Sequence, residues 1–92
     1  MKTLLVIDDE ESVRYSFRSI FSSAAVTVLT TGTGAEGLAQ VRAHNPDVII
    51  LDLQLPDQSG LAVFAEIQAL APKKPVLFIK QTDVNDLHSS IA

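Results

Sequence analysis

The sequence predicts an α/β domain in which a parallel sheet lies between two layers of helices. Short apolar runs, typical of buried strands, alternate with stretches whose apolar residues recur at helical spacing. The connections between them are short, and this alternation favours a parallel sheet with right-handed crossovers. The chain has 92 residues, which indicates a single domain, 1–92. Because 47% of the residues are hydrophobic and only 5% are aromatic, we expect an aliphatic core.

The N-terminal third of the chain predicts a strand, a helix and a second strand. The run Leu4–Ile7 is continuous and apolar, which is typical of a strand buried on both faces. Apolar residues then follow at helical spacing: Val13, Phe17, Ile20, Phe21 and Ala24. The short β-branched run Val26–Thr30 predicts the second strand.

A capping box predicts where the second helix begins. The hydroxyl of Thr33 can accept a hydrogen bond from the amide of Glu36, and the Glu36 side chain can reach back. The face of this helix carries Ala35, Leu38, Ala39 and Arg42. Pro46 ends the helix, and the apolar run Val48–Leu51 predicts a third strand that ends at Asp52.

Turn residues separate the third strand from the third helix. Pro56, Ser59 and Gly60 mark this turn, where Gly60 serves either an ordinary turn or a close approach of the helix. The helix carries Leu61, Phe64, Ile67, Leu70 and Ala71 at helical spacing. The run Val76–Ile79 predicts a fourth strand, and Asp83 can cap a final weak helix.

Charge and composition argue against several classes of function. The net charge is −4 and the basic residues are scattered, which argues against a nucleic-acid-binding surface. The sequence contains no cysteine, so it can form neither a disulfide nor a thiolate metal site. The apolar run after Lys2 stops at Asp8, too early for a signal peptide or a membrane span. We therefore expect a cytoplasmic domain that binds neither nucleic acid nor membrane.

Acidic residues follow two of the predicted strands. In the stretch LLVIDDEE, Asp8 and Asp9 come directly after the first strand, and Asp52 ends the third. If these strands are neighbours, the three carboxylates converge at one edge of the sheet and suit a hard cation such as Mg²⁺. Acids at a helix start also complement the helix dipole, the role we assign to Glu10 and Glu11. Asp8 and Asp9 alone fit both interpretations equally, and Asp52 favours the metal site.

Two stretches, LLVIDDEESVR and PDVIILDLQLPDQSGLAVF, resemble the receiver domain of two-component response regulators. The residue pattern is most similar to that of receivers of enhancer-dependent transcription activators. The resemblance spans roughly residues 3–79. It implies a flavodoxin-like open parallel sheet in three layers, αβα, with strand order 2-1-3-4.

The resemblance also implies roles for individual residues. Asp52 matches the phosphoacceptor, Asp8 and Asp9 match the Mg²⁺-binding pair, and the backbone carbonyl of Gln54 matches a further metal ligand. The implied partner is a sensor histidine kinase, the cofactor is Mg²⁺, and the output domain lies outside this chain. On this view the chain is a signalling module and not an enzyme.

The sequence departs from the family pattern near its C-terminus. The family places Thr or Ser after the fourth strand, where this chain has Lys80. Lys80 either pairs with Asp52 or Asp9, or turns into solvent. The family's fifth strand and fifth helix, with a Lys that faces the acids, are absent, so we expect a C-terminally truncated receiver-like domain. Its fourth strand, Val76–Ile79, then forms an open edge that favours self-association.

Three functions remain open from the sequence. The first is a working receiver that a sensor histidine kinase phosphorylates on Asp52, with or without a conformational switch. The second is a degenerate receiver that acts as a phosphorylation-independent binding module. The third, a Mg²⁺-dependent phosphohydrolase, requires a second Asp two residues after the nucleophile, and Gln54 stands there.

Overall fold

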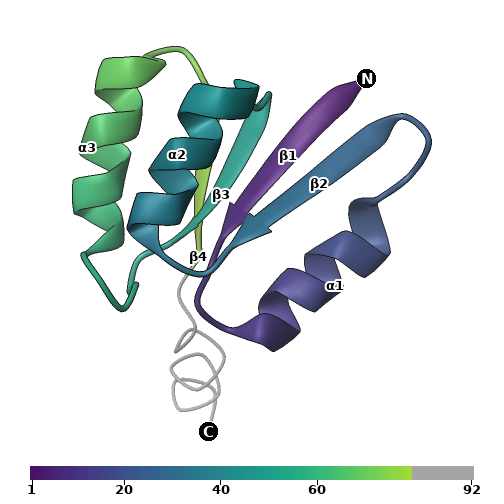
Figure 1. The fold of residues 1–92 in the computed structure, drawn as a ribbon, viewed down its shortest axis with the longest axis horizontal. Coiled ribbons are helices and arrows are strands. Elements are labelled where there is room, and N and C mark those ends of the chain that lie inside the picture. The colour runs from purple at the N-terminus through teal and green to yellow at the C-terminus, as the bar shows by residue number, and fades with distance from the viewer. Residues whose placement is uncertain (80–92) are drawn as a thin grey trace, which may run out of the picture.

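A four-stranded parallel sheet forms the centre of the protein (Figure 1). The computed structural model describes residues 1–79, so the predicted roles of Lys80 and Asp83 lie outside the described part of the chain. The elements are β1 (Lys2–Ile7), α1 (Glu11–Phe21), β2 (Val26–Thr31), α2 (Gly34–His44), β3 (Val48–Asp52), α3 (Gly60–Leu70) and β4 (Val76–Ile79). The strand order is β2-β1-β3-β4, as predicted, and all three pairings are parallel.

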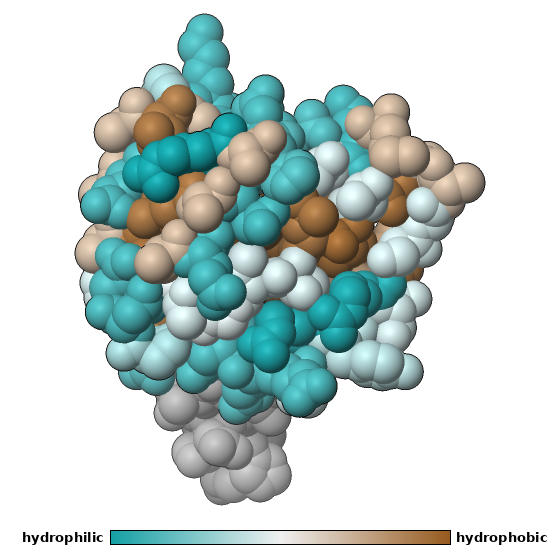
Figure 2. Space-filling view, viewed as in Figure 1, coloured by the Kyte–Doolittle hydropathy of each residue, from teal (hydrophilic) through white to brown (hydrophobic). Residues whose placement is uncertain are grey.

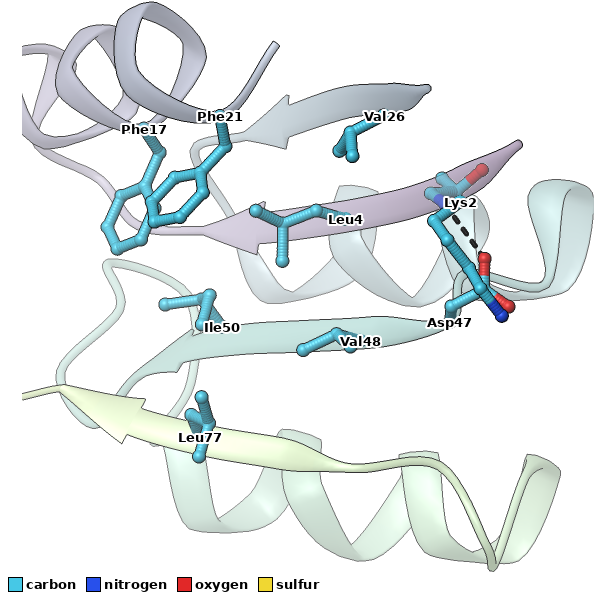
Figure 3. Close-up of a pocket in the computed structure, with 10 residues that line it drawn as sticks. Lys2, Leu4, Phe17, Phe21, Val26, Asp47, Val48, Ile50 and Leu77 are labelled. Carbon is cyan, nitrogen blue, oxygen red and sulfur yellow. Dashed lines mark hydrogen bonds between the residues drawn. The ribbon is translucent and has the colours of Figure 1, made fainter. Parts of the chain in front are cut away.

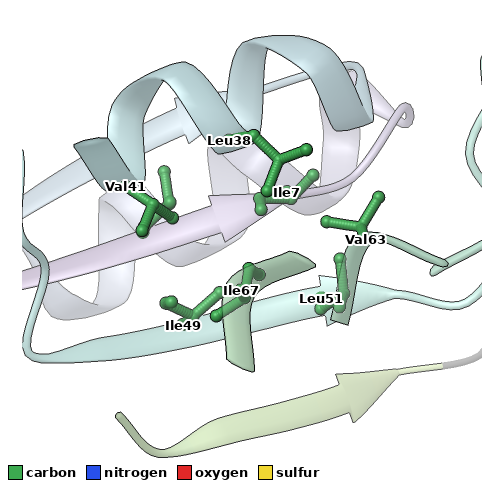
Figure 4. Packing of buried hydrophobic residues seen from close by; sticks show 8 residues of the cluster. Ile7, Leu38, Val41, Ile49, Leu51, Val63 and Ile67 are labelled. Carbon is green, nitrogen blue, oxygen red and sulfur yellow. The ribbon is translucent and has the colours of Figure 1, made fainter. Parts of the chain in front are cut away.

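Within the described residues, two helices cover one face of the sheet and one helix covers the other. Helices α2 and α3 lie together on one face, and α1 lies on the other (Figure 1). The main core is the layer between the sheet and the α2–α3 pair (Figure 4). Its buried members are Leu5, Ile7, Leu38, Val41, Ile49, Leu51, Val63 and Ile67. Aliphatic side chains fill this layer, in agreement with the composition.

Helix α2 approaches the sheet with a face that the sequence pattern did not predict. A Cβ placed on Gly37 would meet the side chain of Ile7, 2.8 Å from its Cγ1, so the missing side chain lets the helix lie close to β1. The buried residues of α2 are Gly34, Gly37, Leu38 and Val41. The predicted Ala35, Ala39 and Arg42 are exposed, because the helix packs against the sheet with the neighbouring face that carries the two glycines.

Helix α1 leaves part of its sheet face uncovered. The predicted apolar stripe of α1 contains no buried residue, and Ala24 lies beyond the end of the helix. Phe17 and Phe21 stack on each other, with ring centroids 5.7 Å apart, beside a groove of about 580 Å³ (Figure 3). This apolar groove is lined by Lys2, Thr3, Leu4, Phe17, Phe21, Val26, Asp47, Val48, Ile50 and Leu77. Because α1 packs over β1 and β2, its side chains do not cover the β3–β4 half of this face.

Helix α2 is capped at both ends. The Thr33 hydroxyl accepts a hydrogen bond from the Glu36 amide at 3.1 Å and donates one to the Glu36 carboxylate at 3.0 Å. The predicted box therefore forms, although Glu36 reaches the hydroxyl of Thr33 and not its backbone amide. Helix α2 ends at Asn45, a left-handed residue with φ of 45°.

No helix within residues 1–79 is long and apolar enough to span a membrane.

Candidate functional site

Three carboxylates meet at the carboxyl-terminal edge of the sheet. Strands β1 and β3 are neighbours, with Ile7 opposite Leu51, so the residues that follow them lie side by side. Asp8, Asp9 and Asp52 each place an oxygen within 4.8 Å of the others. Asp8 and Asp52 are fully buried, whereas Asp9 is exposed and connects the cluster to solvent. The convergence expected from the sequence is therefore present.

Burial and mutual repulsion disfavour the charged form of Asp52. Burial is the largest cause that raises its pKa, to about 6, and the negative charges of Asp8 and Asp9 add to the rise. The backbone amide of Gln54 donates a hydrogen bond to Asp52 Oδ1 at 3.0 Å, which acts in the opposite direction. A cation would relieve this repulsion, and carboxylate oxygens are the ligands that Mg²⁺ prefers. The residues present therefore fit a hard divalent cation.

The loop between β3 and α3 holds Asp52 in place. The amide of Gly60 donates a hydrogen bond to the carbonyl of Leu53 at 2.8 Å, and Gln54 pairs with Ser59 in an isolated antiparallel bridge. A Cβ on Gly60 would lie 2.6 Å from the Leu53 Cα and would also overlap the Asp52 carbonyl oxygen. Of the two roles considered for Gly60, the close approach of the helix is therefore the one observed.

The predicted helix-dipole role of the neighbouring acids is met in part. Glu11 lies in the first turn of α1, where a negative charge is favourable. Glu10 occupies the N-cap position but makes no side-chain capping hydrogen bond. Gln54 is exposed next to Asp52, and the metal-binding role of its carbonyl stays a prediction.

Two hydrogen-bonding contacts at this edge were not predicted from the sequence. Arg14 donates a hydrogen bond from Nη1 to the backbone carbonyl of Asp8 at 2.6 Å. Asp57 accepts hydrogen bonds from the amides of Gly34 and Ala35, at 2.9 Å and 3.0 Å. Each partner belongs to another element, so no local pattern could identify these contacts.

Comparison with known proteins agrees with this geometry. Residues 4–91 match the family described as Response regulator receiver domain. The chain is 36% identical over 86 residues to the transcriptional regulatory protein KdpE of Mycobacterium tuberculosis, covering 94% of this chain and 38% of KdpE. It is 31% identical over 87 residues to the DNA-binding transcriptional regulator NtrC of Escherichia coli, covering 95% of this chain and 18% of NtrC.

A solved structure supports the same assignment. The response regulator receiver domain protein from Clostridium thermocellum superposes with a TM-score of 0.80 at 26% identity, over 99% of this chain and 75% of that one. A CheY-like receiver domain protein from Methanospirillum hungatei has the same fold, with a TM-score of 0.83. These matches confirm the flavodoxin-like fold and the predicted family, although the chain spans well under half the length of KdpE and NtrC. The chain belongs to the receiver domains of two-component response regulators.

Proposed function

We propose that this chain accepts a phosphoryl group on Asp52 in a Mg²⁺-dependent reaction. The observation that carries the proposal is the cluster of Asp8, Asp9 and Asp52 oxygens within 4.8 Å of one another. Asp52 is fully buried at the end of β3, and its carboxylate is held by the Gln54 amide. With a pKa of about 6, Asp52 is mostly ionised at neutral pH and can act as a nucleophile.

The residues of the cluster have different tasks in this reaction. Asp8, Asp9, Asp52 and the carbonyl of Gln54 would hold Mg²⁺. Bound Mg²⁺ would neutralise the carboxylates and the phosphoryl oxygens that approach them. Because Asp9 is exposed, the donor would approach the buried Asp52 carboxylate from the Asp9 side of the cluster. The hydrogen bond from Gln54 fixes the orientation of the Asp52 carboxylate before the donor arrives.

The donor we propose is a phosphohistidine of a sensor histidine kinase. A carboxylate oxygen of Asp52 forms a bond to phosphorus while the nitrogen–phosphorus bond of the donor breaks. The imidazole keeps the electron pair, and Asp52 becomes an acyl phosphate. Lys80 stands at the Thr/Ser position of the family but lies outside the described residues, so the absence of a switch stays a prediction.

Phosphoryl labelling tests this function. Incubated with Mg²⁺ and acetyl phosphate, the wild-type protein should gain the mass of one phosphoryl group. Asp52→Asn should gain none, because the nucleophile is lost. Asp47→Asn is the matched control. Asp47 lies directly before β3, at the opposite end of the strands from Asp52, and accepts a hydrogen bond from the Thr3 amide. Labelling should also disappear in EDTA.

The same experiment separates the remaining candidates. A wild-type protein that binds Mg²⁺ but gains no label would contradict phosphoryl transfer and favour the binding module. Transient labelling with rapid release of phosphate would favour a phosphohydrolase, although Gln54 cannot supply the proton that such a reaction needs.

We further propose that the edge strand β4 mediates self-association. Within residues 1–79, β4 is one edge of the sheet, and Leu77 and Phe78 on it are 57% and 39% exposed. Figure 2 shows a second place where hydrophobic residues reach the surface, over the strands between α2 and α1. An edge with apolar side chains and open backbone groups tends to pair with another strand.

Charge substitution on the edge tests the self-association. Sedimentation velocity should reveal concentration-dependent association of the wild-type protein, and Leu77→Lys should reduce it. Leu61→Lys is the matched control, because Leu61 is 64% exposed on α3, away from the edge. A wild-type monomer at all concentrations would refute the proposal, and an equal effect of both substitutions would place the contact elsewhere.

A further inference from the structure

Asp57 ties the loop that follows the candidate phosphoacceptor to another element of the fold. Its two carboxylate oxygens accept hydrogen bonds from adjacent amides at the start of α2, one from Gly34 at 2.9 Å and one from Ala35 at 3.0 Å. These bonds lower the pKa of Asp57. The negative charge is also well placed against the positive end of the helix dipole. Asp57 therefore makes a bidentate contact with helix α2, which precedes it in the chain.

The contact acts on the tip of a closed loop. At its base, the Gln54–Ser59 bridge and the hydrogen bond from Gly60 to Leu53 hold the two ends together. The base also contains Gln54, whose amide orients Asp52. Within residues 1–79, the hydrogen bonds of the tip, residues 55–58, to other elements are the two made by Asp57.

The start of α2 is shaped to receive this loop. A Cβ placed on Gly34 would lie 2.8 Å from Cγ of Gln58 and 2.7 Å from Cγ2 of Val63. A side chain at this position would displace the Gln58 side chain of the loop and crowd Val63 of α3. Close packing and hydrogen bonding thus coincide at the same point of contact.

We infer that Asp57 is a positioning residue: by clamping the loop to α2, it fixes the geometry of Gln54 and Asp52 at the cation site. Only two residues lie between Gln54 and Asp57, and the Gln54–Ser59 bridge couples the position of the tip to that of the base. This inference rests on the proposed function for its Mg²⁺ readout, because outer contacts that orient metal ligands govern metal affinity.

A comparison of two caps of the same helix tests the inference. Asp57→Ala removes the clamp, and Thr33→Ala removes the other side-chain cap of α2, the bond to the Glu36 amide. Both substitutions weaken the start of α2, but only Asp57 belongs to the loop. Asp57→Ala should lower Mg²⁺ affinity about tenfold, whereas Thr33→Ala should leave it near the wild-type value. Asp57→Asn, which keeps one oxygen acceptor, should give an intermediate value and serves if the Ala variant does not fold.

A second readout does not depend on the metal. In EDTA, hydrogen exchange at the Gln54 and Gly60 amides should be faster in Asp57→Ala than in Thr33→Ala, because these amides donate the hydrogen bonds at the base of the loop. If hydrogen exchange and Mg²⁺ affinity are equal in the two variants, Asp57 is only a cap of helix α2, and the inference is overturned. Unchanged Mg²⁺ affinity in Asp57→Ala, with a wild-type protein that binds Mg²⁺, would also overturn it. If the wild-type protein binds no Mg²⁺, the proposed function fails, and exchange alone decides the role of Asp57.

Discussion

Replacing Asp52 by Asn should raise the free energy of unfolding of the metal-free protein at neutral pH by up to about 3 kcal/mol. Substitution of a fully buried residue normally destabilises a protein, but here the ionised wild-type side chain is itself costly. Its pKa rises from 3.8 to about 6 on folding, chiefly through burial and then through the charges of Asp8 and Asp9. An Asn amide carries no charge, can keep the hydrogen bond with Gln54, and can donate one to a neighbouring carboxylate.

The raised pKa also fixes the sign of a pH effect. Because the folded protein holds the Asp52 proton more tightly than the unfolded chain, its contribution to stability is fully present below pH 3.8 and is lost as pH rises through about 6. The wild-type protein should therefore be more stable at about pH 5 than at about pH 7.5, by roughly 1–2 kcal/mol from this group. Asp47 and Asp57 have lowered pKa values, so the stability they contribute is lost only at lower pH.

Urea unfolding in EDTA at these two pH values checks the prediction. The pH dependence between them should largely disappear in Asp52→Asn. If Asp52→Asn is less stable than the wild-type protein at neutral pH, the prediction is wrong. Such a result would imply that the cluster stabilises the ionised Asp52 carboxylate.

Mg²⁺ titration of the same variant tests whether the carboxylates share one site. Asp52→Asn and Asp9→Asn should both weaken Mg²⁺ binding, because each removes a charged oxygen ligand. Asp47→Asn should not affect binding. If neither variant of the cluster binds more weakly, the three carboxylates do not form a common site.

Replacing Gly60 by Ala should destabilise the protein by about 3 kcal/mol or more. The added Cβ would lie 2.6 Å from the Leu53 Cα and would overlap the Asp52 carbonyl oxygen. Both neighbours are backbone atoms, which cannot move without displacing the end of β3 or the start of α3. The loss is large for a domain of this size, whose whole stability is about 5–15 kcal/mol. Urea unfolding followed by circular dichroism measures it.

Gly32→Ala provides the matched control for Gly60. Its Cβ would meet only the flexible end of the Arg14 side chain, 3.2 Å away. We expect a much smaller loss than at Gly60, because the end of a side chain can shift where backbone atoms cannot, although the shift strains the hydrogen bond from Arg14 to Asp8. Equal losses at the two positions would indicate a general cost of replacing glycine and would contradict the close-approach explanation.

Much of the fold and of the acid cluster is encoded locally. Three apolar runs and one β-branched run predict the four strands to within two residues at each end, because apolar and β-branched residues favour strands. The cluster of Asp8, Asp9 and Asp52 followed from the parallel arrangement, which brings the carboxyl ends of neighbouring strands to one edge. The neighbouring position of β1 and β3 came from the family resemblance, and the observed sheet agrees with it.

Tertiary structure alone decided which faces are buried and which distant residues meet. The apolar stripe of α1 predicted burial, but the helix covers only part of its sheet face, and periodicity does not encode what lies opposite a helix. The buried face of α2 shifted because Gly37 fits against Ile7, a contact between residues 30 positions apart. The clamp from Asp57 to Gly34 spans 23 residues. Such contacts depend on the path of the whole chain, whereas the sequence by itself determines the local periods, the turns and the order of the acidic strand ends.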